Sequence, residues 1–68
     1  MRECIFVQGW DNAIIKINLQ DMKCLYTEHF DQQSLLYNLI VEFFTSEKLT
    51  IQISAAEKER IYRLLKEI

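Results

Sequence analysis

The stretch that most constrains the fold of this chain is residues 32–45, which read QQSLLYNLIVEFFT. It contains neither proline nor glycine, and Asp31 in front of it offers a side-chain acceptor of the kind that begins a helix. Placed on a helix, its apolar residues leave only a narrow polar stripe of about 80°. We therefore expect a helix here that carries more apolar surface than one neighbour covers.

Two arrangements would cover such a helix, and the sequence leaves both open. In the first, it is the central helix of the domain, with a sheet on one side and a second helix on the other. In the second, Tyr37, Val41 and Phe44 project from it into a homodimer or into a groove on a partner protein. The second arrangement makes these three residues candidate interface residues.

The length of the chain indicates a single domain, residues 1–68, near the lower size limit for folding without disulfides or metal. Half of the residues are hydrophobic and 26% are charged, which is the balance of a globular protein. No segment resembles a linker, because the chain has one glycine and no proline. We expect all connections to be short.

The remaining segments favour strands and one further helix. Residues 4–8 are rich in strand formers, residues 13–19 and 49–53 alternate between apolar and polar, and residues 23–27 fit a third strand of a meander after a turn at 20–22. Ser54 followed by Glu57 matches a capping box. A helix should follow to the C-terminus, with an apolar stripe of Ile61, Leu64, Leu65 and Ile68.

The element order is therefore ββ(β)αβα. It predicts an α+β fold in which two helices pack on one face of a small antiparallel or mixed sheet of three to four strands.

The only glycine and the only tryptophan of the chain stand together, as Gly9 and Trp10, in a loop between the first two predicted strands. Glycine adopts positive φ freely, so turn geometry accounts for Gly9. Trp10 has two interpretations. Its indole folds back and caps the end of the core, or it stands out as a contact anchor with Asp11 and Asn12 as a polar rim.

The sequence offers little to catalysis or to a cofactor. It has a single histidine, His29, and neither a phosphate-binding glycine loop nor a nucleophile elbow. The ligand-type residues Cys4, Cys24, His29 and Asp31 lack the close pairs of a structural zinc site. We expect no enzyme, no metal and no cofactor. The two cysteines lie in apolar company with no signal-type segment before them, which favours a cytoplasmic protein.

Charge argues against most nucleic-acid binders. The formal net charge is −2, and the cations of the last helix alternate with glutamates. A stacking surface of Phe6, Tyr26 and Trp10 keeps a nucleic-acid alternative open. A membrane span is not expected, because no apolar run approaches the ~20 residues that it requires.

These observations predict a small, non-catalytic, cytoplasmic protein–protein interaction module of the adaptor, inhibitor or regulatory-subunit type. A homodimer is one form it would take. The expected contact residues are Trp10, Tyr37, Val41 and Phe44. The alternative function is a small nucleic-acid-binding regulator.

Overall fold

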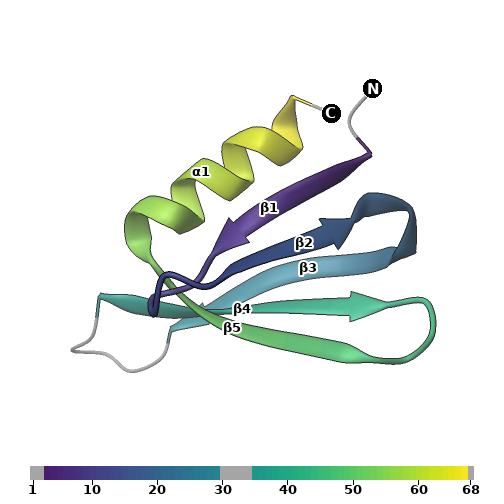
Figure 1. Ribbon diagram of the computed structural model, residues 1–68, viewed down its shortest axis with the longest axis horizontal. Helices are drawn as coiled ribbons and strands as arrows, with labels where there is room; N and C mark the ends of the chain where they lie inside the picture. The colour runs from purple at the N-terminus through teal and green to yellow at the C-terminus, as the bar shows by residue number, and fades with distance from the viewer. Residues whose placement is uncertain (1–2, 30–34, 68) are drawn as a thin grey trace.

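The computed structural model describes residues 3–29 and 35–67, and it shows an α+β fold of two antiparallel sheets and one C-terminal helix (Figure 1). The elements are β1 (Cys4–Gln8), β2 (Ile14–Asn18), the 3-10 turn η1 (Leu19–Asp21), β3 (Met22–His29), β4 (Leu36–Phe43), β5 (Lys48–Ser54) and α1 (Ala55–Lys66). One sheet is the hairpin β1-β2, and the other has the order β3-β4-β5. The expected pair of helices on one face of one sheet is wrong, because the described residues contain a single α-helix.

The predicted helix at residues 32–45 is the largest error. Residues 36–43 form β4, the central strand of the three-stranded sheet, while residues 31–34 lie outside the described part of the chain. Leu39 and Val41 point into the core, and Ile40, on the opposite face, is only 8% exposed between its partners on β3 and β5. A strand buried on both faces has a continuous apolar run, which a helical wheel also reads as apolar all round.

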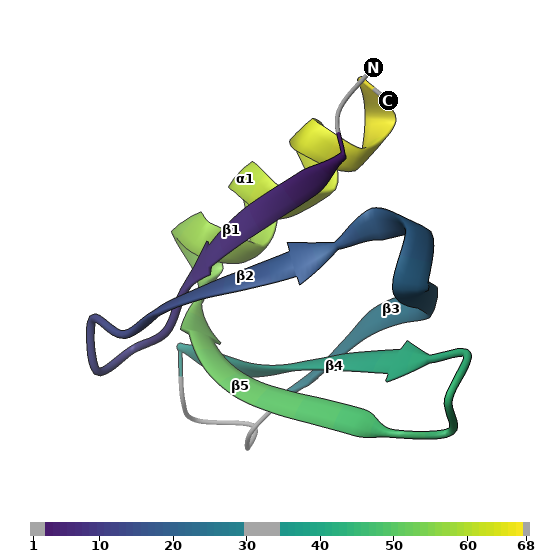
Figure 2. The ribbon, with the colours of Figure 1, turned by 45° about the vertical axis from the view of Figure 1, so that its right-hand side comes forward.

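The hairpin β1-β2 confirms the two strands predicted at the start of the chain. Its register pairs Ile5 with Ile17 and Val7 with Ile15, and these side chains face the core. The hairpin crosses over the inner face of the three-stranded sheet, and η1 carries the chain from β2 into β3 (Figure 2). The turn predicted at 20–22 and the strand predicted at 23–27 are therefore confirmed. The meander is wrong, because β3 pairs with β4 in the second sheet and not with β2.

The core lies between the two sheets and is closed by α1 (Figures 1 and 2). Its buried members are Ile5, Val7, Ile17, Leu39, Val41, Ile51, Ile53 and Ile61. The helix contributes Ile61, and Leu65 packs beside it, as the apolar stripe predicts. Ser54 caps the helix by accepting a hydrogen bond from the Glu57 amide at 3.1 Å, which confirms the predicted start.

Candidate functional site

The loop between β1 and β2, residues 9–13, is fixed by its own hydrogen bonds, and we call it the Trp10 loop. The Gly9 amide donates to the Ala13 carbonyl at 2.8 Å, and the Asn12 amide donates to the Gly9 carbonyl at 3.0 Å. The Asp11 side chain accepts from the Ala13 amide at 3.1 Å. Asn12 adopts the left-handed conformation, with φ of 70°, and its side-chain oxygen accepts a hydrogen bond from the side-chain amide of Gln8. These hydrogen bonds therefore fix the conformation of the loop in the free protein.

Gly9 is needed for space rather than for positive φ, which corrects the sequence interpretation. No glycine in the described chain has positive φ. A Cβ on Gly9 would lie 2.9 Å from Oδ1 of Asp11 and 3.4 Å from a methyl group of Ile51. The first contact is too short for a real Cβ, and the Asp11 carboxylate has little freedom because it holds the Ala13 amide. Glycine therefore lets the hairpin end lie close against β5.

Trp10 is displayed on this loop rather than used to cap the core. Its backbone amide donates to the Gln52 carbonyl at 2.7 Å, which ties the loop to β5. Its side chain nevertheless remains 61% exposed. A fixed backbone that carries an exposed indole loses little conformational entropy when the indole is covered by another molecule.

Two hollows meet at Trp10, one on each side of the loop. The β5-edge hollow has a volume of about 270 Å³, and the helix-side hollow has about 510 Å³. The β5-edge hollow is lined by Trp10, Asp11, Ala13, Ile15, Thr50, Ile51 and Gln52. The helix-side hollow is lined by Gln8, Gly9, Trp10, Asn12, Ser54, Ala56, Glu57 and Arg60. Both walls combine apolar atoms with exposed polar groups, which is how contact surfaces for polypeptides are built.

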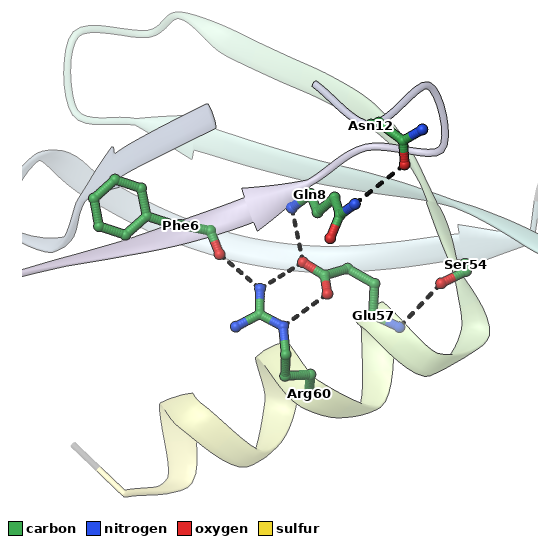
Figure 3. Close-up of polar contacts among 6 residues, drawn as sticks. All are labelled: Phe6, Gln8, Asn12, Ser54, Glu57 and Arg60. Atoms are coloured by element: carbon green, nitrogen blue, oxygen red, sulfur yellow. Dashed lines mark hydrogen bonds and ion pairs between the residues drawn. The ribbon is translucent and has the colours of Figure 1, made fainter. Parts of the chain in front are cut away.

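A set of charged side chains closes the outer edge of β1, and we call Glu57 and Arg60 the β1-edge clasp (Figure 3). Nε of Arg60 donates to Oε1 of Glu57 at 2.7 Å, and its Nη2 donates both to Oε2 of Glu57 and, at 2.7 Å, to the Phe6 carbonyl. The Gln8 amide donates to Oε2 of Glu57 at 2.8 Å. The clasp satisfies backbone groups that a neighbouring strand would otherwise bind.

The electrostatics of the clasp follow from this geometry. The hydrogen bonds from Arg60 lower the pKa of Glu57 most, and burial of the carboxylate opposes them; the bond from the Gln8 amide lowers the pKa further. The same pairing raises the pKa of Arg60. Glu57 was expected to reach back to its own helix start in a capping box, but it binds β1 and Arg60 instead. It therefore links the helix to the hairpin.

The four predicted contact residues do not form one surface. Val41 is fully buried in the core, so its expected projection towards a partner is wrong. Tyr37 is half-buried, its ring lies 4.5 Å from the ring of His29, and the Lys58 ammonium stands 4.3 Å above it. Phe44 is exposed in the β4–β5 turn, at the opposite end of the molecule from the Trp10 loop (Figures 1 and 2). Only Trp10 is both exposed, as predicted, and flanked by the two hollows.

Two further exposed apolar residues belong to the hairpin that carries Trp10. Phe6 and Ile14 are each more than half exposed. They lie on the outer face of β1-β2, in neighbouring cross-strand pairs, Phe6 with Lys16 and Gln8 with Ile14. The sequence signal was present, since both stand out of phase with the inward residues of their strands. Phe6 was predicted only as part of a stacking surface, and Ile14 was not predicted as a contact residue.

Reactive side chains are few around these surfaces. Sγ of Cys24 lies 3.5 Å from Oε2 of Glu42, and burial, followed by the Glu42 carboxylate, raises the pKa of this thiol. Burial and the same carboxylate raise the pKa of Tyr26. Residues 3–29 and 35–67 bring no three His, Cys, Asp or Glu side chains together in a group that would hold a metal ion. Within the same residues, α1 is too short and too polar for a membrane-crossing helix.

Comparison of the chain with models of protein families, with curated proteins and with solved structures gave no match, so its function has to be inferred from its own residues.

Proposed function

We propose that this chain is a small, non-catalytic protein-interaction module that contacts its partner through the Trp10 loop. The observation that carries this proposal is the 61% exposure of Trp10 on a backbone fixed by hydrogen bonds within the loop and to β5. Tryptophan is enriched among the residues that dominate binding energy, particularly where a rim of polar groups surrounds it. Asp11, Asn12 and Gln52 supply such a rim.

The exposed indole is large enough to matter for binding. A tryptophan side chain buries up to about 250 Å², and 61% of that area is roughly 150 Å². Covering it would contribute roughly 4 kcal/mol at about 25 cal/mol per Å², before the costs of association are subtracted. Phe6 and Ile14 extend the apolar surface along the outer face of the hairpin.

The proposed partner is a different protein and not a second copy of this chain. The homodimer was expected because a helix at residues 32–45 would leave apolar surface uncovered. That segment is instead the central strand of a sheet, with Val41 in the core. The reason for self-association through Tyr37, Val41 and Phe44 is therefore removed.

The arrangement of aromatic residues favours protein over nucleic acid as the partner. Phe6 lies on the outer face of the hairpin, while Tyr26 lies on the outer face of the three-stranded sheet, so they do not form one stacking platform. Two cations of the helix are already engaged, Lys58 over the Tyr37 ring and Arg60 with Glu57.

A cytoplasmic setting is part of the same proposal. Cys4 and Cys24 are both free and half-buried thiols. Thiols of this kind are typical of reducing compartments, where disulfides are rare.

Site-specific photo-crosslinking in cells tests the proposed contact. A benzophenone amino acid replaces Trp10 in one variant and exposed Lys66, at the far end of α1, in the control. We expect a discrete crosslinked protein product from position 10 and none from position 66. Equal products from both positions, or none from position 10, would contradict the proposed site.

A further inference from the structure

The outer edges of the two sheets are not equivalent. The edge of β1 is closed by the clasp of Glu57 and Arg60. The edge strand β3 begins with a register irregularity between Met22 and Cys24, and such bulges disrupt pairing with a further strand. The edge of β5 differs from both, since it borders the β5-edge hollow and the Trp10 loop.

The direction of the backbone groups along β5 can be read from its register. The Phe43 amide donates a hydrogen bond to the Glu47 carbonyl at 2.9 Å, and the pairing of β4 with β5 continues from there. Because bonded and non-bonded pairs alternate in an antiparallel ladder, the amide and carbonyl groups of Thr50 and Gln52 point away from β4. The bond from the Trp10 amide to the Gln52 carbonyl, on the outer side, agrees with this direction.

Thr50 therefore presents an unpaired backbone amide and carbonyl at the edge of β5. Its amide and carbonyl have no hydrogen-bond partner within residues 3–29 and 35–67, and the residue is exposed. The neighbouring Gln52 offers its amide as a further donor, since only its carbonyl is taken by Trp10. Unpaired strand edges of this kind bind extended segments by adding one more strand.

We propose that the β5-edge hollow takes a single extended segment of another polypeptide, which pairs with Thr50 and Gln52 and places one side chain against the Trp10 indole. This inference rests on the proposed function and names the form of its partner. The hollow, at about 270 Å³, lies below the range of about 300–1,000 Å³ that is usual for small-molecule sites. Its size suits a side chain and a short length of backbone.

A second copy of β5 does not fit this edge. In a two-fold pairing centred on Thr50, Lys48 of each copy would face Gln52 of the other. The Gln52 carbonyl is already bound by Trp10, and the Trp10 loop stands at that point of the edge. In that pairing the β4–β5 turn in front of Lys48 of the second copy would meet the Trp10 loop, whereas a single segment that ends opposite Gln52 stops short of it.

The charge of the hollow indicates which residues the bound segment carries. Asp11 is the one charged residue among those that line it. One carboxylate oxygen of Asp11 holds the Ala13 amide, which leaves the other to meet a cation. A segment with an arginine or lysine beside a β-branched or aromatic residue would pair with Asp11 and cover the indole.

A library of random extended peptides displayed on phage and selected on the full chain tests the inference. We expect enriched peptides that carry a basic residue beside an apolar one. Thr50→Pro should weaken their binding at least about tenfold, because it removes the outward amide. Thr27→Pro is the matched control, since the Thr27 amide also points away from β4 but lies on the edge of β3, which contributes no residue to the lining of the hollow. It should leave binding within about twofold.

Amide hydrogen exchange on the unmodified chain gives a readout that does not depend on how the proline variant folds. Binding of a selected peptide should slow exchange at Thr50 and Gln52. Peptides that lose affinity with Trp10→Ala, yet leave the Thr50 amide exchanging freely and bind Thr50→Pro normally, would overturn strand addition and keep the Trp10 contact. Failure to enrich any peptide, or peptides that tolerate both Trp10→Ala and Thr50→Pro, would overturn both proposals.

Discussion

The clasp between the helix and β1 leads to a quantitative expectation for Glu57→Gln. The carboxylate accepts two hydrogen bonds from Arg60 and one from the Gln8 amide, and its side chain is only 10% exposed. Glutamine keeps the shape of the side chain but has one acceptor oxygen and no charge. The substitution therefore removes the ion pair and leaves one of these donors without its acceptor.

The size of the loss can be built from its parts. Arg60 is 47% exposed, so its pairing contributes only about 0.5–1 kcal/mol after screening. The bond from the Gln8 amide to a charged acceptor adds about 1 kcal/mol, and a negative charge in the first helical turn adds about 0.5 kcal/mol. Together these give roughly 2 kcal/mol, against a total of about 3–10 kcal/mol expected for a domain of this length.

The same carboxylate should make stability depend on pH. Its pKa in the folded chain lies below the ordinary value of glutamate, mainly because of Arg60. The unfolded chain therefore takes up the proton first, and protonation favours unfolding. The contribution of Glu57 is present above the ordinary pKa and is lost as pH falls below about 4.5 through the lower folded value. The difference in stability between the natural chain and Glu57→Gln should shrink over that range.

Urea unfolding followed by circular dichroism, at neutral pH and at several acid pH values, measures both effects. Glu59→Gln is the control, because Glu59 is an exposed residue of α1 with no ion pair to the rest of the described chain. It should change stability by less than about 0.5 kcal/mol. Equal effects of the two substitutions, or a Glu57→Gln effect that stays constant through the acid range, would refute the role assigned to the clasp.

Three further outcomes are expected. Ile61→Ala, at the fully buried contact of α1, should lower the free energy of unfolding by about 2–5 kcal/mol in urea titrations, and a loss below 1 kcal/mol would contradict the helix packing. Gly9→Ala should cost about 1–3 kcal/mol by the same measurement, because its Cβ meets the Asp11 carboxylate at 2.9 Å; an unchanged midpoint would count against the close approach. Glu42→Gln should speed alkylation of Cys24 by iodoacetamide near neutral pH, by less than about tenfold, because loss of the carboxylate lowers the pKa of the thiol; the rate, followed by mass spectrometry, should not fall.

Local patterns predicted much of the fold. The alternation in residues 13–19 and 49–53, the turn at 20–22 and the Ser54 cap all correspond to observed elements. These signals are local, because they depend on neighbours within one strand or one turn.

The error at residues 32–45 has a physical cause outside the segment. Whether an apolar run becomes a buried strand or a buried helix depends on what covers it, and here β3 and β5 pair with both of its edges. The β-branched Ile40 and Val41 and the aromatic Phe43 favour a strand, while the spread of apolar residues around a helical wheel favours a buried helix.

The candidate site was only partly accessible to sequence reasoning. Trp10 was identified from its place in the loop, but its exposure depends on the contact between the loop and Gln52, far along the chain. The clasp and the unpaired backbone groups of Thr50 also depend on tertiary structure, which a single sequence does not reveal. Val41 was misplaced because its direction follows from strand geometry, not helix geometry.

Fluorescence quenching of Trp10 tests the display of this residue most directly, since the chain has no other tryptophan. Acrylamide should quench the folded chain with close to six-tenths of the efficiency that it has for the urea-unfolded chain, in line with the 61% exposure of the side chain. The emission should lie near that of free tryptophan and should not change on dilution. A blue-shifted emission with quenching suppressed to a small fraction would show the indole covered within the chain or by a second copy, and would contradict its role as an exposed contact.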